Sequence, residues 1–273
     1  LSFPRMADVH PTTPGPSAGW HDPELANPHE HAEKATKVRG MFTSIAASYD
    51  LNNRVHSLWM DQHWRRQAVR AAQVRPGDVV ADLACGTGDL TMAFARSAAE
   101  RIIGLDYTAA MLDYARIKAK RLPAEIATRI TYQEADAHNL PLDARSVDVV
   151  SMAFGIRNVA NPARVAAECA RILRPGGRIV ILEFVRPINP VLRWLNDVYC
   201  GQIMPRTATW ISRDKSGAYK YLPRSVSTFM EPAAMERLLS DAGFEAVSSR
   251  PLFPGICQCY RANAPVKPAG LAT

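Results

Sequence analysis

The stretch from Val79 to Leu90 constrains the fold more strongly than any other part of the chain. Apolar and small residues lead to Asp82, and a turn that contains Gly86 and Gly88 follows before a helical pattern begins. This order predicts a buried parallel strand, a tight turn and a helix N-terminus. Glycines suit such a turn because a Cβ would hold a ligand away from the backbone and would oppose a positive φ. We therefore expect a ligand to lie against this turn, beside the polar Thr87.

A second strand supplies a carboxylate to the same edge of the expected sheet. The run from Arg101 to Asp106 ends in an acidic side chain, whose oxygens can accept both ribose hydroxyls of an adenosine. The glycine turn lacks the third glycine of the dinucleotide fingerprint, since Thr91 stands at that position. The spacing from Asp82 to Gly88 resembles instead the loop with which class I methyltransferases bind S-adenosylmethionine. An ordinary strand-to-helix turn is the alternative for the loop by itself.

Strand and helix patterns alternate along most of the chain. Such alternation predicts an α/β fold in which helices cover both faces of a mostly parallel, Rossmann-like sheet. The expected strands are 78–83, 101–106, 129–135, 147–153 and 178–184, and the expected helices are 89–98, 109–121 and 162–173. A final helix over 231–242 precedes two runs, 244–250 and 255–261, which we expect to form an antiparallel hairpin at the sheet edge.

Further candidate site residues follow the later strands. In such sheets ligands bind outside the carboxyl ends of the strands, where the strand order reverses. Asp136 and Ala137 follow the third strand, and the carboxylate can accept a hydrogen bond from the exocyclic amine of an adenine. A role as a turn or helix N-cap residue is the alternative for Asp136. Ala153, Arg157 and Asn158 come at the end of the fourth strand and are expected at the same edge.

The chain before the first strand divides into an arm and a lid. Residues 1–37 are rich in proline and histidine without a helical or strand period, so we expect a disordered N-terminal arm, and residues 263–273 are typical of a flexible tail. Residues 38–75 carry two aromatic-rich helical patterns, which we interpret as a helical lid over the cofactor cleft. Tyr49 and Asp50 lie at the junction of these helices. Helices that only pack on the sheet edge are the alternative.

An insertion over 184–228 separates the fifth strand from the final helix. Arginines and lysines outnumber acidic residues there, and aromatic side chains lie between them. A basic and aromatic surface can stack single-stranded nucleic acid, or it can rest on an anionic membrane while a lipophilic substrate enters. A helix with a solvated basic face is the third interpretation.

Composition fits one large soluble domain, which we place at residues 38–262. The chain has 273 residues, of which 47% are hydrophobic, and its net charge is +7. Residues 1–20 lack the apolar core of a signal peptide and no run is long enough to span a bilayer, so we expect a cytoplasmic protein. The cysteines are scattered without a second metal-ligating pair, so we expect free thiols and no metal.

Several motifs together make the chain similar to the ubiquinone/menaquinone biosynthesis C-methyltransferases. The similarity extends from about residue 37 to 261, and its most specific motif is Phe-Gly-Ile-Arg-Asn at 154–158. The other motifs are Phe-x-x-Ile-Ala-x-x-Tyr-Asp at 42–50, Asp-Leu-Ala-Cys-Gly-Thr-Gly-Asp at 82–89, Leu-Arg-Pro-Gly-Gly at 173–177, Leu-Glu-Phe at 182–184 and Tyr-Lys-Tyr-Leu at 219–222. The resemblance implies transfer of a methyl group from S-adenosylmethionine to a ring carbon of a polyprenylated quinol.

The resemblance also implies roles for residues at matching positions. Cofactor contacts are implied for Thr87, Asp106, Asp136 and Ala137, and with Asp82, Gly86, Gly88 and Ala153 they form the candidate cofactor-binding set. The chain departs from the family pattern at Cys85, at Ala153 and before Tyr219, where the segment is one residue longer. The first two departures leave backbone contacts with the methyl donor available. The third departure means that the family pattern does not define the shape of the quinol pocket.

A ring carbon needs activation before it can accept a methyl group. Loss of the proton from a neighbouring phenolic hydroxyl moves negative charge onto that carbon, and no metal is required. Arg157 and Asn158 are placed to hold the hydroxyl, the phenolate or a water that takes the proton, and the alternative for Arg157 is an ion pair with a structural carboxylate. The remaining candidates are Tyr219 near the chemistry and Tyr49, Asp50 and Tyr221 along the substrate pocket.

We therefore expect methylation of demethylmenaquinol to menaquinol, a C-methylation step of ubiquinone biosynthesis, or both. The expected partners are the lipophilic quinol and an anionic membrane surface to which the protein binds peripherally, without nucleic acid. The sequence is compatible with assembly as a homodimer and with assembly in a quinone-biosynthesis complex. A methyltransferase that acts on a non-quinone phenol or a sterol is the alternative, and an RNA-binding methyltransferase is a further one.

Overall fold

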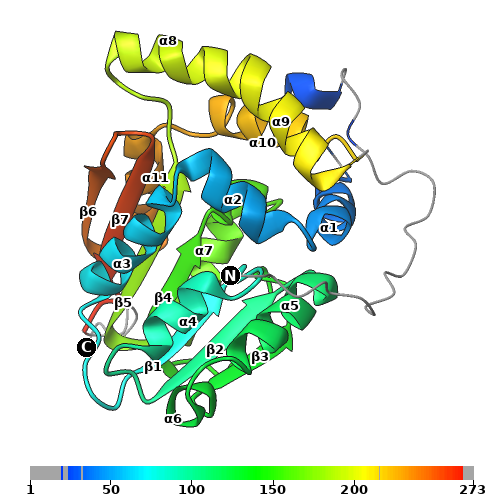
Figure 1. The fold of residues 1–273 in the computed structure, drawn as a ribbon. Helices are drawn as coiled ribbons and strands as arrows, with labels where there is room; N and C mark the ends of the chain where they lie inside the picture. Colours follow the sequence, from blue (N-terminus) through cyan, green and yellow to red (C-terminus); the bar gives the residue numbers. More distant parts are fainter. Residues whose placement is uncertain (1–19, 21–23, 32, 215, 267–273) are drawn as a thin grey trace.

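Within the residues that the structure describes, a sheet of seven strands forms the centre of the fold (Figure 1). The structure is a computed structural model, and it describes residues 20, 24–31, 33–214 and 216–266. The strands are β1 (Val79–Leu83), β2 (Arg101–Asp106), β3 (Ile130–Glu134), β4 (Val147–Ala153), β5 (Leu173–Phe184), β6 (Glu245–Leu252) and β7 (Cys257–Asn263). Their order across the sheet is β3-β2-β1-β4-β5-β7-β6.

The first five strands are parallel, and the last two form an antiparallel hairpin beside β5. This arrangement confirms the predicted sheet and its C-terminal hairpin. From β1 the chain proceeds outward to β3 and then returns to β4 on the other side of β1. The strand order therefore reverses between β1 and β4, and the carboxyl edge beside this reversal is where such sheets bind ligands.

The β5 strand begins earlier than its sequence predicts. We expected residues 174–177 to form a turn before a strand at 178–184. Instead, Leu173 already pairs with Val147, and the register shifts before Arg178 pairs with Val149. The shift accommodates the intervening Pro-Gly-Gly run inside the strand, because an irregular pair can absorb extra residues without ending the ladder.

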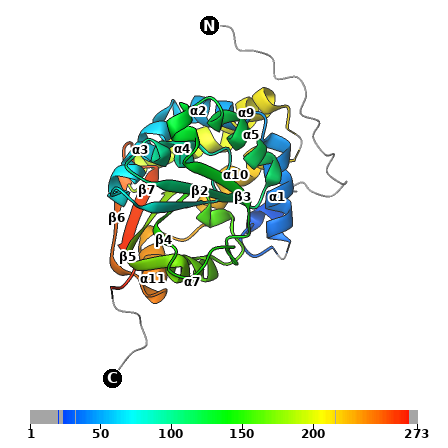
Figure 2. The same ribbon diagram turned by 90° about the horizontal axis from the view of Figure 1, so that it is seen from below.

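Helices cover both faces of the sheet, as Figure 2 shows. On one face lie α3 (Met60–Ala72), α4 (Asp89–Ala95) and α5 (Ala109–Ala119), and on the other lie α7 (Pro162–Ile172) and α11 (Pro232–Asp241). Several short elements were not predicted, among them the 3-10 turn η1 (Glu24–Ala26), α6 (Ala124–Ala127) and the 3-10 turn η2 (Ile156–Asn158). Single turns of helix carry too few residues for a periodic apolar pattern.

Apolar side chains at helical spacing attach these helices to the sheet. On α3, Trp64, Ala68 and Ala72 follow one another at four-residue intervals and are all fully buried. On the opposite face, Val165 and Cys169 of α7 occupy the same spacing and join the other apolar cluster. This regular spacing explains why the helices could be predicted from the sequence.

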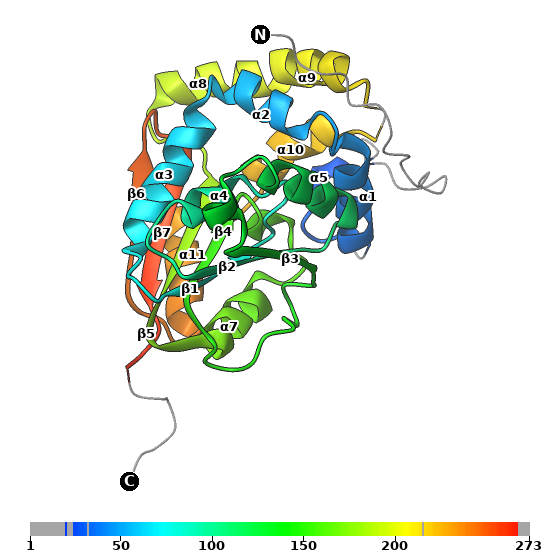
Figure 3. The ribbon, with the colours of Figure 1, turned by 60° about the horizontal axis from the view of Figure 1, so that its bottom comes forward.

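A second group of helices covers the carboxyl edge of the sheet (Figure 3). Its members are α1 (Lys34–Ile45), α2 (Tyr49–Ser57), α8 (Pro190–Val198), the π-helical turn η3 (Tyr199–Ile203), α9 (Met204–Ser212) and α10 (Ala218–Ser227). We call α8 to α10 the canopy. His56 Nδ1 and the Tyr199 hydroxyl lie 2.7 Å apart and join α2 to the canopy. The predicted lid and the predicted insertion therefore meet above the site.

The segment before α1 corrects the prediction of a disordered arm over 1–37. Residues 1–19, 21–23 and 32 of that arm lie outside the described residues. In the described part, Trp20 and Leu25 are buried in one apolar cluster with α10, and Lys34 already belongs to α1. The Trp20 ring stacks on Tyr221, about 200 residues away in the sequence, and no local pattern reveals that contact. At the other end of the chain, Ala264 is buried, and residues 267–273 lie outside the described residues.

Candidate functional site

The glycine turn between β1 and α4 takes the conformation that its sequence predicts. Gly86 and Gly88 both have positive φ, at +56° and +80°. A Cβ on Gly88 would also collide with the hydroxyl of Tyr132. The Gly86 N–H donates to Asp106 Oδ2 at 2.8 Å, which fastens the turn to the end of β2. The turn and Asp106 thus form one unit at the reversal point of the sheet.

A cleft with about 900 Å³ of empty space opens beside this unit, and we call it the first cleft. Five predicted cofactor-binding residues line it, namely Gly86, Asp106, Asp136, Ala137 and Ala153. Residues of the lid helices, including Arg39, Phe42 and Tyr49, complete the lining. The lid prediction is therefore in accord with the position of α1 and α2.

Asp106 presents a carboxylate to the first cleft. Its Oδ1 accepts from the Thr108 N–H at 2.8 Å, and its Oδ2 accepts from the Gly86 N–H at the same distance. Burial raises the pKa of Asp106, and the two backbone N–H groups oppose that rise. Each carboxylate oxygen can accept a further hydrogen bond. The group is thus able to accept two neighbouring hydroxyls, as a ribose ring offers them.

Asp136 lines the same cleft while it binds a neighbouring histidine. Its Oδ1 accepts from the His138 backbone N–H at 2.9 Å and lies 2.6 Å from His138 Nδ1. The Asp136 side chain is still 52% exposed, so it keeps surface for a ligand. This geometry is compatible with the predicted adenine contact and with the turn role that was its alternative.

Three other predicted cofactor-binding residues do not line the first cleft. Asp82 is fully buried, and its oxygens accept from the hydroxyls of Thr91 at 2.6 Å and Ser151 at 2.7 Å. Burial raises the pKa of Asp82 to about 6. Thr87 donates its hydroxyl to the lid helix α2, and Gly88 packs against α5 and β3. These three residues therefore stabilise the turn through contacts with other elements and do not line the first cleft.

A second, larger cavity lies between the lid, the canopy and the sheet, with about 2190 Å³ of empty space. Phe154 and Phe184 stack in its wall with ring centroids 4.4 Å apart, and Trp64 meets both rings edge-on. Met204 and Leu222 of the canopy line the opposite side. The cavity therefore combines aromatic and aliphatic surface with charged residues such as Arg157 and Arg206, and it suits a large ligand that has both an apolar and a polar part.

Tyr49 and Phe154 line both spaces and form the wall between them. The Tyr49 ring lies against the glycine turn, since a Cβ on Gly86 would be 4.0 Å from Tyr49 Cε1. Burial raises the pKa of Tyr49, while the positive charges of Arg65 and Arg157 oppose that rise. A reactive group in the first cleft and an acceptor in the second cavity would meet at this wall.

Arg157 and Asn158 lie on different sides of the wall. Arg157 lines the second cavity, and its Nη1 donates to Glu183 Oε1 at 2.6 Å and to the Phe154 carbonyl at 2.8 Å. The pair with Glu183 is the structural ion pair that was the alternative for Arg157. Asn158 lines the first cleft, and its Oδ1 accepts from the Tyr221 hydroxyl at 3.0 Å.

Tyr219 and Tyr221 line neither space, although both were predicted at the site. They are buried in the apolar cluster that contains Trp20, on the far side of α10. The side of α10 that faces the second cavity carries other residues, among them Leu222. Among the described residues, Tyr221 is connected to the site through its hydrogen bond to Asn158. We therefore assign no substrate contact to either tyrosine.

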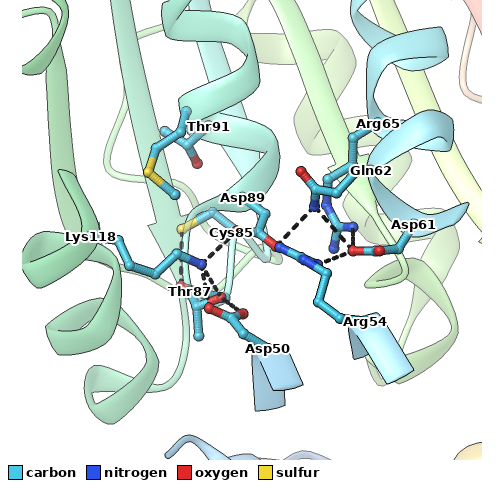
Figure 4. Close-up of polar contacts among 12 residues, drawn as sticks. Asp50, Arg54, Asp61, Gln62, Arg65, Cys85, Thr87, Asp89, Thr91 and Lys118 are labelled. Atoms are coloured by element: carbon cyan, nitrogen blue, oxygen red, sulfur yellow. Dashed lines mark hydrogen bonds and ion pairs between the residues drawn. The ribbon is translucent and has the colours of Figure 1, made fainter. Parts of the chain in front are cut away.

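A row of alternating charges joins the lid to the glycine turn (Figure 4), and we call it the charge row. Its members in order are Asp50, Lys118, Asp89, Arg54, Asp61 and Arg65. Lys118 Nζ is 2.5 Å from both Asp50 and Asp89, and Arg65 Nη1 is 2.6 Å from Asp61. The row crosses four helices, so it holds the lid helices against α4 and α5.

Asp50 has a different place from the one predicted. Its Oδ1 accepts from the Thr87 hydroxyl at 2.5 Å, and it lines neither the first cleft nor the second cavity. It therefore anchors the charge row at the glycine turn. Sequence reasoning missed Lys118 because its partners Asp50 and Asp89 come from other helices, and it missed Arg65 although its partner Asp61 lies on the same helix. Only the four-residue spacing of Asp61 and Arg65 gives a local signal.

Comparison with known proteins gives consistent matches over most of the chain. Residues 30–263 match the model of the ubiE/COQ5 methyltransferase family. The chain is 38% identical over 231 residues to the ubiquinone/menaquinone biosynthesis C-methyltransferase UbiE of Citrifermentans bemidjiense, which covers 84% of this chain and 97% of that relative. It is 35% identical over 269 residues to the UbiE of Ectopseudomonas mendocina, which covers 97% of this chain and 100% of that relative.

Solved structures share the fold. A SAM-dependent methyltransferase from Aquifex aeolicus aligns with a TM-score of 0.53 at 16% identity, over 73% of this chain and 89% of that one. A SAM-dependent methyltransferase from Thermotoga maritima aligns with a TM-score of 0.56 at 18% identity, over 82% of this chain and 99% of that one. These matches concern the fold alone, and they confirm the predicted class I methyltransferase architecture.

Proposed function

The chain belongs to the ubiE/COQ5 methyltransferase family, and we propose that it transfers a methyl group from S-adenosylmethionine to a ring carbon of a polyprenylated quinol. The product is menaquinol from demethylmenaquinol, a C-methylated ubiquinone precursor, or both. The wall of Tyr49 and Phe154 is the observation that carries this proposal. It separates a cleft with acceptors for a nucleoside from an aromatic cavity with room for a lipophilic ring. Relatives named for quinone biosynthesis do not favour a sterol, a non-quinone phenol or RNA as the substrate.

The first cleft has hydrogen-bond acceptors that suit S-adenosylmethionine. Asp106 would accept the ribose hydroxyls, and Asp136 would accept from the adenine amine. Ala137 and Ala153 offer small apolar surfaces, and Gly86 lets the backbone approach the ligand. The bound donor supplies an electrophilic methyl group on a positively charged sulfur. No metal enters this proposal.

The second cavity would hold the quinol ring beside the wall, with its prenyl chain along the apolar lining. Arg157 can contribute to binding despite its pair with Glu183. Among the described residues, its Nη1 and Nε make side-chain hydrogen bonds, while Nη2 makes none and the residue lines the cavity. Arg157 would thus donate to a ring oxygen, and Asn158 would complete the first cleft on the other side of the wall.

The transfer releases one proton. The phenolic O–H bond breaks, its proton passes to water, and the electron pair shifts into the ring. A carbon–carbon bond then forms to the methyl group as the carbon–sulfur bond breaks, and the electron pair of that bond stays on sulfur. The methylated ring carbon loses its hydrogen as a proton and the oxygen regains one, which restores the aromatic quinol. Holding the two carbons roughly 3 Å apart is the main task of the site.

We also propose that the canopy rests on an anionic membrane, from which the substrate enters. Helix α8 has no buried residue, and large apolar side chains are exposed on the canopy and beside it, as at Ile188 (88%), Trp194 (64%), Trp210 (82%) and Trp59 (62%). Arginines of the same segment supply positive charge for lipid headgroups. None of the described helices is long and apolar enough to cross a membrane.

Vesicle flotation tests the membrane proposal. The protein should float with anionic vesicles, and its recovery should fall as salt rises. Trp194→Ser should reduce the recovery, whereas Tyr114→Ser, at a tyrosine of α5 that lines neither space, should not. Equal recovery with neutral and anionic vesicles would speak against the anionic surface.

Quinone profiles of cells test the catalytic proposal. Cells that lack this protein should accumulate a quinone one methyl group lighter than that of wild-type cells. Expression of the wild-type chain should restore the methylated quinone. An unchanged quinone profile in the deletion strain would exclude the proposed substrate class.

A further inference from the structure

The second cavity contains a buried cation whose donors are only partly used. Arg65 of α3 is 6% exposed and lines the cavity. Its Nη1 donates to Asp61 Oδ2 at 2.6 Å. Its Nε is buried and has no hydrogen-bond partner among the described residues. A buried charge with an unused donor is unfavourable, so a negatively charged ligand beside the guanidinium in the cavity would be stabilised.

Arg65 stands at the wall where the methyl group would be transferred. Its guanidinium carbon lies 5.5 Å from the centre of the Phe154 ring. Its charge also acts on Tyr49, the other ring of the wall, where it opposes the rise in pKa that burial causes. Tyr49 is itself a phenol, so it experiences the field that a phenolic substrate would meet at this wall. Burial outweighs this charge at Tyr49, whose pKa stays raised, but the charge itself favours the ionised form of a phenol placed beside Arg65.

Arg65 and Arg157 differ in how their charges are balanced. Arg157 has its own carboxylate, because Glu183 accepts from both its side chain and its backbone N–H. Asp61, in contrast, is shared between Arg54 and Arg65. The charge row in Figure 4 alternates in sign and ends at Arg65, beside the cavity. A negative charge next to Arg65 would extend that alternation by one member.

We propose that Arg65 binds the ring oxygen of the quinol that ionises and stabilises the phenolate as the ring carbon becomes nucleophilic. This inference rests on the proposed function, and it adds a catalytic residue to it. The phenolic proton still leaves to water, and Arg65 neither gains nor loses a proton because its guanidinium stays charged. A cation that is fixed before the reaction stabilises developing charge without reorganisation. Asp61 is then a positioning residue, which holds the guanidinium at the wall.

The first test compares Arg65→Gln with a matched control on the same helix. Arg66 follows directly on α3 and is exposed, and it lines neither the first cleft nor the second cavity. Arg65→Gln should lower kcat by about a hundredfold or more, while the Kd of S-adenosylmethionine stays unchanged. Arg66→Gln should keep the wild-type kcat. Arg65→Lys retains the charge but loses the planar fork, so its kcat should lie between those of wild type and Arg65→Gln.

The second test measures the ionisation of a bound phenol, which a merely structural role would not change. The probe is 4-methoxy-1-naphthol with a short prenyl chain, whose phenolate has a distinct ultraviolet absorbance. In the wild-type protein its pKa should fall by about one to three pH units relative to the free probe. In Arg65→Gln that decrease should largely disappear.

The outcomes separate this inference from the proposed function. If wild type methylates a quinol and Arg65→Gln does so at the same rate, with the same phenol pKa, Arg65 is not the phenolate ligand. If Arg65→Gln does not fold, the wild-type measurement decides, because a bound probe with the pKa of the free phenol overturns the inference. If wild type does not methylate any quinol, the proposed function itself fails.

Discussion

Replacement of Glu183 by glutamine should destabilise the fold, because it leaves a buried arginine without its carboxylate. Glu183 is 1% exposed and Arg157 is 3% exposed. Glu183 Oε1 accepts from Arg157 Nη1 at 2.6 Å, and its Oε2 accepts from the Arg157 N–H at 3.2 Å. Glutamine keeps the size of the side chain and one acceptor oxygen, but it removes the negative charge and places an NH₂ donor where the second oxygen accepts.

The expected loss follows from the burial of both partners. Breaking a buried ion pair by changing one partner typically costs about 3–5 kcal/mol of unfolding free energy. Arg157 retains its hydrogen bonds to the Phe154 carbonyl and the Ser225 hydroxyl, so we expect the lower end, about 3 kcal/mol. For a domain of this size that loss corresponds to a decrease in Tm of about 6–12 °C.

Calorimetry and urea unfolding at pH 7 measure the effect. The matched control is Asp113→Asn, which removes an exposed carboxylate that pairs with Arg116 at 3.0 Å. An exposed pair of this kind contributes less than about 1 kcal/mol, so the Tm of the control should hardly change. If Glu183→Gln is no less stable than the control, the buried pair does not hold the turn after β4, and the physical reasoning about Arg157 is refuted.

Two further predictions concern carboxylates at the glycine turn. Asp106→Ala should weaken S-adenosylmethionine binding ten- to a hundredfold, or about 1.5–3 kcal/mol, because it removes a charged acceptor from the first cleft; unchanged affinity in titration calorimetry would contradict the assignment. Burial raises the pKa of Asp82 to about 6, so the folded state binds this proton more tightly than the unfolded state and wild type should lose stability as pH rises from about 4 to 6. Asp82→Asn should lack that component, and urea unfolding at pH 4 and pH 7 that shows parallel changes in both proteins would exclude it.

Local sequence patterns predicted the elements that hold the first cleft. The buried strand before Asp82, the glycine turn and the acidic end of β2 each occupy a few consecutive residues, so their signals were complete within the sequence. Because parallel strands end at one edge, the meeting of Gly86 and Asp106 followed from topology alone.

The second cavity could not be predicted in the same way. Its lining comes from α2, α3, the ends of β4 and β5 and the canopy, and the orientation of the canopy helices depends on their packing. The sequence therefore gave no means to tell that Tyr219 and Tyr221 face the cluster around Trp20. The charge row was not predicted for a similar reason, because Lys118 and Asp50 are far apart in the sequence. Assembly as a homodimer or within a quinone-biosynthesis complex stays a prediction.

Methyl transfer from a labelled donor shows whether this chain methylates a ring carbon of a quinol. The purified chain is incubated under reducing conditions with S-adenosylmethionine that carries a trideuterated methyl group and with short-chain demethylmenaquinol, and the product is fragmented in a mass spectrometer. We expect one trideuterated methyl group on a ring carbon, and we expect oxidation of the product to yield the corresponding methylated quinone. A label on oxygen, or a donor that binds while neither this quinol nor a benzoquinol precursor is methylated, would contradict it.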